Sequence, residues 1–179
     1  MSTRRDAFAQ PEELIRRVYA YVAYRIGDGP DAEDVTSEAF ARALRYKESF
    51  DNEKGDAVSW LVGIARRCIA THLGGQASSV PDVPEPGASP DVAEHVLRRV
   101  ELAEALATLP ERDRELVALR YGADLTAQQI AALLELRTNT VEVALHRSLA
   151  RLREQLEGSD VPGAPGSTPV SVSPASSDI

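Results

Sequence analysis

Seven side chains between residues 137 and 147 are of the types that contact base pairs in DNA. Arginine can donate two hydrogen bonds to guanine, and asparagine can pair with adenine in a similar way. A helix that carries such residues on one face could lie in the major groove and reach base edges. The seven are Arg137, Thr138, Asn139, Thr140, Glu142, His146 and Arg147.

The flanking sequence predicts two helices that would position these residues. Thr126-x-x-Gln129 has the spacing of a capping box, which opens a short helix. A three-residue turn at 135–137 follows, and Thr138 begins a longer helix, which completes a helix-turn-helix layout. Helical pairs with polar outer faces also occur in bundles, so this pattern alone leaves DNA binding and a structural role open. The apolar stripe of the longer helix is Val141, Leu145, Leu149, Leu152 and Leu156.

The overall charge argues against a protein that coats DNA by bulk attraction. The 179 residues include 20 Lys and Arg against 28 Asp and Glu, for a formal net charge of -8. Residues 137–153 nevertheless contain four arginines and one glutamate, so positive charge concentrates where the motif needs it. Only 5% of the residues are aromatic, and alanine and leucine are frequent, which favours an all-α fold.

No arrangement of residues indicates an enzyme, a metal site or a cofactor. His72, His95 and His146 are isolated from cysteines and from paired carboxylates. Cys68 is the only cysteine, which excludes an intrachain disulfide, and its apolar helical setting favours a buried structural thiol over a redox switch. Residues 1–10 lack the apolar segment of a signal peptide, and no stretch is long enough to span a membrane, so we expect a cytoplasmic protein without a membrane partner.

Two segments rich in Gly, Pro and Ser divide the chain. They predict a first helical module over 1–73, a flexible linker over 74–92, a second module over 93–157 and a disordered tail over 158–179.

Three helices are expected in the first module. The first runs from Pro11 to about Ile26, Asp31 is expected to cap the second, and Lys54-Gly55-Asp56 precedes the third. Their inward residues are expected to be Ile15, Val18, Val22 and Ile26, then Val35, Ala39, Phe40, Ala43 and Leu44, and finally Trp60, Leu61, Ile64, Cys68 and Ile69.

Two further helices precede the helix-turn-helix pair. The first covers about 97–106, and Pro110 opens the second in its first turn, with Gly122 ending it. The apolar residues are Leu97, Val100, Ala103 and Leu106, then Leu116, Val117, Leu119 and Tyr121.

Acidic residues cluster at the start of the second helix, at Asp31, Glu33, Asp34 and Glu38. Acids at a helix N-terminus offset the macrodipole, and physics alone favours this explanation. The alternative is an exposed acidic face that docks on a basic partner surface.

Both modules together resemble bacterial extracytoplasmic-function sigma factors, over about 12–73 and 97–157. The first module resembles region 2 through Asp31-Ala32-Glu33-Asp34-Val35, Glu38-x-Phe40-x-x-Ala43, Phe50, Trp60-Leu61 and Ile64-Ala65-Arg66. The second resembles region 4 through Leu106-x-x-Leu109-Pro110-x-x-x-Arg114, Leu119-Arg120-Tyr121, Leu125-Thr126, Ile130-Ala131 and Leu145-His146-Arg147.

The resemblance implies a promoter-recognition subunit of RNA polymerase, built from a region-2 helical bundle and a region-4 helix-turn-helix. It implies that the acidic helix binds the clamp helices of the polymerase β′ subunit through Asp31, Asp34, Glu38 and Arg42. Region 4 would bind the β flap and contact the minus-thirty-five element through the seven residues named first. An anti-sigma factor is a possible further partner.

The resemblance also assigns minus-ten recognition to the first module. The loop over 51–56 corresponds to the loop that captures a flipped base of that element. The residues implied are Asn52, Lys54, Trp60, Arg66 and Arg67.

Several positions depart from the family pattern. Ser37 stands where a glutamine is common, Glu135 replaces the glycine of the helix-turn-helix, and the basic stretch that usually follows Arg67 is missing. The recognition helix reads Val141-Glu142-Val143-Ala144 in place of a more basic sequence. Fewer cationic side chains make fewer phosphate contacts, so we expect weaker nonspecific DNA binding and an unusual minus-thirty-five preference.

Two alternatives use the same residues differently. A free-standing helix-turn-helix regulator would need to dimerise on two half-sites, and no dimerisation segment is evident. An interaction module could keep the polymerase-binding face and lack promoter recognition.

Overall fold

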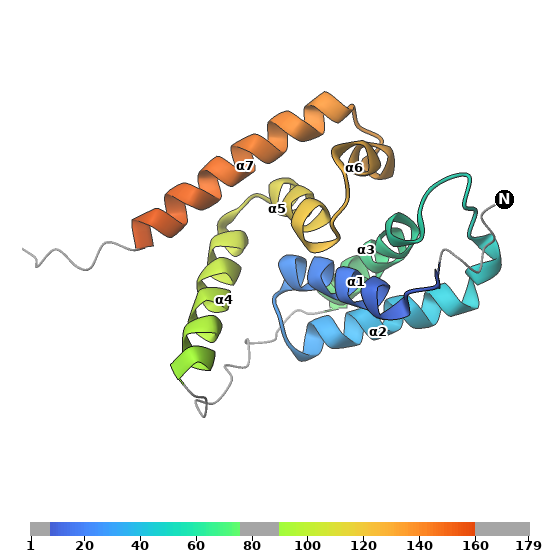
Figure 1. Cartoon of the computed structure of the whole chain (residues 1–179), viewed down its shortest axis with the longest axis horizontal. Helices are drawn as coiled ribbons and strands as arrows, with labels where there is room; N and C mark the ends of the chain where they lie inside the picture. Colours follow the sequence, from blue (N-terminus) through green and yellow to red (C-terminus); the bar gives the residue numbers. More distant parts are fainter. Residues whose placement is uncertain (1–7, 76–89, 160–179) are drawn as a thin grey trace, which may run out of the picture.

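The computed structural model describes residues 8–75 and 90–159, and these residues form helices with no strand among them, which confirms the all-α fold (Figure 1). The first module contains α1 (Pro11–Ile26), α2 (Pro30–Arg45), a short 3-10 helix η2 (Lys47–Ser49) and α3 (Ala57–Gly75). The second contains α4 (Pro90–Thr108), α5 (Glu111–Val117), a π-helical segment η3 (Ala118–Gly122), α6 (Ala127–Leu134) and α7 (Thr138–Ser159).

Several helix ends differ from those expected. Helix α3 continues through Gly75 and α4 begins at Pro90, so both helices extend into the expected 74–92 linker. Pro110 precedes α5 as its N-cap and does not occupy its first turn. The remaining linker residues, 76–89, and the tail from 160 onward lie outside the described residues, as do the side chains of His95 and Leu97.

The inward face of α1 is rotated from the one expected. Ile15 is 47% exposed, whereas Leu14 and Tyr21 are buried beside Val18. Each helical residue turns by about 100°, so positions 14, 18 and 21 share one face and Ile15 lies beside it. Leu44 was expected inside and is 72% exposed at the end of α2. In the second module Tyr121, Val100 and Leu156 are likewise exposed, and so is Ala103.

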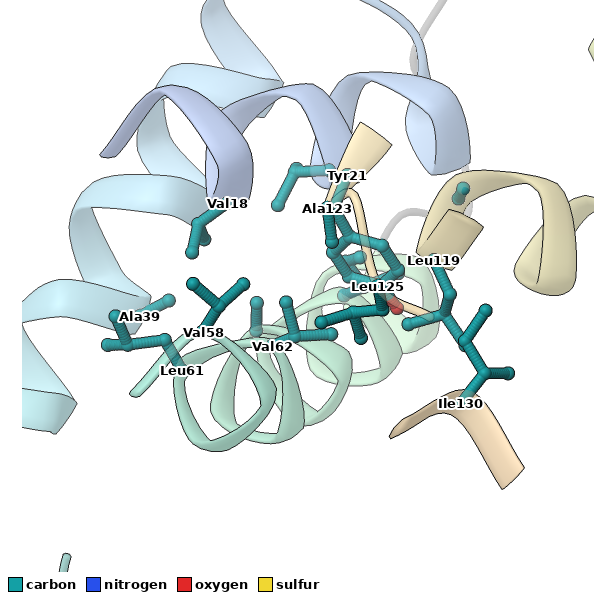
Figure 2. Close-up of a cluster of buried hydrophobic side chains, with 14 of the residues drawn as sticks. Val18, Tyr21, Ala39, Val58, Leu61, Val62, Leu119, Ala123, Leu125 and Ile130 are labelled. Carbon is teal, nitrogen blue, oxygen red and sulfur yellow. The ribbon is translucent and has the colours of Figure 1, made fainter. Parts of the chain in front are cut away.

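The two modules share one hydrophobic core. Tyr21 of α1 belongs to the same cluster of buried side chains as Leu119, Ala123 and Leu125 of the second module, and Val18 of α1 lies nearer Val58 of α3 (Figure 2). This core also contains Ile130 of α6 and buried residues of α2 and α3. A smaller cluster joins α4, α5 and α7 through Ala105, Leu106, Leu109, Val117 and Leu152. The sequence predicted two modules and gave no indication that they pack on each other.

The closest approach between the modules is at Gly122. A Cβ atom there would lie 2.8 Å from both the Cα and the backbone nitrogen of Tyr21. Only a glycine permits such proximity of two backbones. Next to it, Arg17 of α1 donates hydrogen bonds to the carbonyl oxygens of Ala123 (2.8 Å) and Asp124 (2.9 Å). Side-chain and backbone contacts therefore fix α1 against the segment after η3.

A buried carboxylate links the modules electrostatically. Glu115 of α5 is 8% exposed and forms ion pairs with Arg25 of α1 and Arg66 of α3, the latter at 2.8 Å. The Tyr21 hydroxyl donates to the same carboxylate at 3.0 Å. Burial raises the pKa of Tyr21 to about 12, against the opposing effect of both guanidinium groups. The tyrosine therefore stays protonated at neutral pH and remains a donor to Glu115.

Candidate nucleic-acid interface

The helix-turn-helix forms as the sequence predicted. The Thr126 hydroxyl accepts from the Gln129 backbone N–H at 3.2 Å, and the Gln129 side chain accepts from the Thr126 backbone N–H at 2.8 Å. This reciprocal capping box fixes the start of α6. Glu135, the residue that replaces the usual glycine, adopts the left-handed conformation with φ 55° and ends the helix. The turn therefore keeps the glycine geometry without the glycine.

The seven minus-thirty-five candidates lie along the outer surface at the start of α7. Val141 and Leu145 are buried in the core, and Glu142 and Val143 between them are exposed. Six of the seven candidates are exposed and Thr138 is half-buried. Arg151, counted among the cationic side chains of this segment, instead pairs with Asp113 of α5 at 2.5 Å. Its charge fixes α7 on α5 and is partly neutralised for DNA.

The minus-ten loop presents two of its candidates to solvent. Asn52 and Lys54 are both exposed, and the Lys54 ammonium lies 3.4 Å from the Asp51 carboxylate. Asp51 also accepts the Glu53 backbone N–H at 3.1 Å, which shapes the turn. Asn52 lines a cavity of about 460 Å³ whose walls also include Arg17 of α1 and Gln129 of α6. Asn52 and Asp56 of the 51–56 loop, to which the resemblance assigns base capture, both line this cavity.

Asp56 also lines this cavity, and the sequence analysis did not name it as a candidate site residue. Its carboxylate accepts the Ser59 backbone N–H and hydroxyl, both at 2.9 Å, at the start of α3, and the Gln129 amide at 2.5 Å. Burial raises the pKa of Asp56, but these hydrogen bonds outweigh it and hold the pKa below its ordinary value. The signal in the sequence was weak, because an aspartate three residues before a serine is a common N-terminal pattern.

The other minus-ten candidates lie along α3 in different environments. Trp60 packs in a cluster with Phe50 and Phe8, with ring centroids 5.3 and 6.1 Å away. Arg66 is engaged with Glu115, whereas Arg67, the next residue, is exposed. The five candidates therefore do not form one continuous free surface.

The acidic face of α2 points into solvent. Asp31, Asp34 and Glu38 are exposed, and Arg42 donates to Glu38 at 2.6 Å within the same helix. The sequence predicted Asp31 as the N-cap of α2, and this prediction is wrong. Gly29 occupies that position with no side-chain cap, and Pro30 begins the helix because its fixed φ suits the first turn.

Cys68 is buried on α3, and burial raises the pKa of its thiol against the opposing effect of nearby Arg42. The buried placement expected for this thiol is confirmed. Across the described ranges, no three candidate metal ligands gather into one group. No helix within those same ranges has the length and apolarity to cross a membrane.

Family models match both modules. The model for Sigma-70 region 2 matches residues 12–78, and the model for Sigma-70 region 4 matches residues 99–152.

Curated relatives match across both modules in one alignment. The RNA polymerase sigma-E factor of Streptomyces antibioticus is 33% identical over 76% of this chain and 76% of its own length. The ECF sigma factor BldN of Streptomyces coelicolor is 34% identical over 82% of this chain, which spans 60% of BldN. SigK of Mycobacterium ulcerans is 28% identical over 87% of this chain and 88% of SigK.

Two solved structures share the fold at 20% identity. The sigma factor RpoE from Bartonella quintana, crystallised with the anti-sigma factor NepR, gives a TM-score of 0.65 over 86% of this chain and 98% of RpoE. CnrH in complex with the cytosolic domain of CnrY gives 0.62 over 88% and 91%. Since the family models match both modules and the relatives extend across them, the chain belongs to the extracytoplasmic-function family of RNA polymerase sigma factors.

Proposed function

We propose that this chain binds core RNA polymerase and directs it to specific promoters, as an initiation factor without catalytic activity of its own. The observation that carries the proposal is that one chain holds two exposed surfaces of different chemistry. One is the acidic face of α2, and the other is the exposed polar face at the start of α7, which carries Arg137, Asn139 and Arg147. Its place of action is the cytoplasm, where the polymerase works.

The α2 face is suited to a basic partner surface. Asp34 and Glu38 are one helical turn apart and exposed, so both carboxylates can meet the same partner helix. Arg42 pairs with Glu38 and orients it. We assign Asp31, Asp34, Glu38 and Arg42 to the clamp helices of the β′ subunit, since long-range attraction favours encounter between complementary surfaces.

The cavity beside the minus-ten loop is suited to an extruded base. Its polar lining includes Asn52, which can pair with a base edge, while Lys54 lies nearby on the same loop for the phosphate. Flipping a base costs a few kcal/mol, which such contacts repay. Trp60, Arg66 and Arg67 extend the proposed path of the minus-ten strand along α3.

The start of α7 would contact the minus-thirty-five element in the major groove. Arg137 and Asn139 lie at the N-terminal start of this face, and both have bidentate hydrogen-bonding capacity. We assign discrimination among bases to them and to the other five candidates. A region-4 contact with the β flap, and an anti-sigma factor that holds the chain inactive, complete the proposed partners. The two solved relatives are each bound to another protein, which supports the anti-sigma proposal.

Mapping of transcript starts tests the proposed function. Purified core polymerase would transcribe genomic fragments of the source organism with and without the full chain. We expect a defined set of new starts that share two upstream elements. Binding to core polymerase without any new start would contradict promoter recognition and favour the interaction module. A stable dimer that binds a palindrome without polymerase would favour the free-standing regulator.

A further inference from the structure

We propose that a cavity between the start of α1 and the end of α2 binds a small anionic amphiphile. The carboxylate of this ligand pairs with Lys47 at the rim, and its apolar chain lies inside. Medium-chain fatty acids are the ligand class with this chemistry. The inference goes beyond the proposed function and does not depend on it, because the test uses the free chain without polymerase or DNA.

The cavity is large enough for a small molecule. Its volume is about 670 Å³, and small-molecule sites usually span about 300–1,000 Å³. The start of α3 contributes a third side, and Leu14 lies in the walls of both this cavity and the 460 Å³ cavity beside the minus-ten loop. The two cavities are therefore neighbours, but their linings differ in chemistry.

The lining of the larger cavity is apolar apart from two charged residues, Lys47 and Glu48. Its aromatic members are all half-buried, so part of each ring contacts solvent; they are Phe8, Phe40 and Trp60. Leu44, which also lines the cavity, is 72% exposed. A ligand chain that covers this apolar surface is stabilised in proportion to the area it removes from water.

The two charged residues select the sign of the ligand. Lys47 is exposed at the rim, and its ammonium group forms no ion pair with any residue that the structure describes. Glu48 on the same rim already interacts within the chain. A carboxylate at the rim therefore gains a partner in Lys47, whereas a cationic head group would meet an unpaired positive charge.

Two other occupants fit this lining less well. The edge of a nucleic-acid base needs polar partners, and the side chains that line the cavity supply none apart from the rim. The segment before Phe8 reads Met-Ser-Thr-Arg-Arg-Asp-Ala, which is mostly polar. Its two arginines carry the same charge as Lys47, so electrostatics favours a separate anionic ligand.

Calorimetric titration and Trp60 fluorescence on the full chain test the site. Trp60 is the only tryptophan and lines the cavity, so a bound ligand should change its emission. The probe is decanoate below its micelle concentration, and decylammonium is the matched probe of opposite charge. We expect saturable binding of decanoate at one site, with decylammonium at least about fivefold weaker. Octanoate should bind about three- to 15-fold more weakly than decanoate, because two buried methylenes are lost.

Charge reversal at the rim tests the role of Lys47. Lys47→Glu should weaken decanoate binding at least about fivefold and strengthen decylammonium binding, because the rim changes sign. Arg45→Glu is the matched control, since it makes the same charge change on an exposed residue of α2 that does not line the cavity. Its two affinities should stay within about twofold of wild type, because solvent screens exposed charges.

A second variant tests the apolar wall. Leu44→Ser should weaken decanoate binding at least about threefold, because the ligand chain loses apolar contact. Leu44 is 72% exposed, so the substitution should leave folding intact, which circular dichroism checks.

Several results would overturn the inference. Equal binding of decanoate and decylammonium, or an unchanged decanoate affinity in Lys47→Glu, would remove the anionic site. Binding only above the micelle concentration would indicate adsorption of aggregates. Much tighter decanoate binding after deletion of residues 2–7 would assign the cavity to that segment. A dimer that decanoate disperses would assign it to a second copy of the chain, and displacement of decanoate by a single-stranded minus-ten oligonucleotide would assign it to DNA.

Discussion

Helices α2 and α3 belong to the same module, but their polar side chains differ in how they contact the second module. The candidate side chains of α2 are turned to solvent, and Arg42 and Glu38 pair within the helix. On α3, Arg66 pairs with Glu115 of the second module and Asp56 accepts from Gln129. Contacts with the second module thus engage Arg66, a proposed minus-ten residue, whereas the proposed polymerase-binding residues Asp31, Asp34 and Glu38 on α2 are exposed.

The largest effect is expected at the exposed helix. Asp34→Arg combined with Glu38→Arg should reduce binding to core polymerase by more than about 100-fold, because both carboxylates that attract the basic partner become repulsive. Stability should change little, since exposed helix charges contribute little to folding. Pull-down and titration with core polymerase measure the effect.

A control distinguishes a specific face from overall charge. Glu101→Arg combined with Glu104→Arg makes the same charge change on exposed residues of α4. Core binding equal in the two double variants would show that α2 is not the docking face.

Substitutions at the start of α7 should change the base preference at the minus-thirty-five element. Arg137→Ala or Asn139→Ala should each cost about 1–3 kcal/mol at the base pair contacted, because a bidentate hydrogen bond is lost. The measurement is the base preference at the minus-thirty-five element, from a randomised promoter pool transcribed with core polymerase. Arg153→Ala on the exposed surface further along α7 is a control for charge alone. An unaltered preference in both variants would remove these residues from base recognition.

The stability contributed by Asp56 at the start of α3 should depend on pH. The pKa of Asp56 is lowered in the folded chain, so its contribution is present above the pKa of an unfolded aspartate and is lost as pH falls through the lower folded value. We expect the contact with Gln129 to weaken in that acidic range, below about pH 4. Chemical denaturation followed between pH 3 and 7 measures the loss.

Asp56→Asn supplies the comparison for this pH effect. Asparagine still caps a helix, so α3 should form, but its side chain does not titrate. The variant should lose part of the stability difference between pH 3 and 7. A pH dependence identical to that of wild type would mean that other carboxylates account for it.

The smallest effect is expected in the turn of the helix-turn-helix. Glu135→Gly should raise the free energy of unfolding by about 0.5–1 kcal/mol, because a left-handed backbone strains a residue with a Cβ. The greater freedom of glycine in the unfolded chain offsets part of this gain. Thermal unfolding measures the gain, and Glu142→Gly in α7 should instead destabilise. A loss of stability in Glu135→Gly would indicate that the glutamate side chain makes a contact of its own.

Local signals in the sequence predicted most of the helices. The capping box at Thr126 and Gln129 appears as expected, because a cap depends on residues three positions apart. Ile15 and Leu44 were wrongly predicted to be buried. Both lie at the edge of an apolar stripe, and the packing of neighbouring helices decides which edge of the stripe faces inward. A period of three or four residues leaves both edges available.

Docking of the modules could not be predicted in this way. Glu115 meets Arg25 and Arg66, but nothing in the spacing of these charges distinguishes them from exposed ones. In the sequence, Gly122 indicates only the end of a helix and does not predict the close contact with Tyr21. The polymerase-docking role of the acidic face of α2 is a prediction from the family resemblance, since its charges alone favoured the macrodipole explanation.

The aromatic cluster around Trp60 has a spectroscopic consequence. Trp60 is the only tryptophan of the chain and packs on Phe50 beside the minus-ten loop, so tryptophan fluorescence, excited selectively, reports on the first module alone. Circular dichroism follows the helices of both modules. If the shared core makes the modules unfold together, the two signals will follow one denaturation curve, whereas independent modules will give two midpoints.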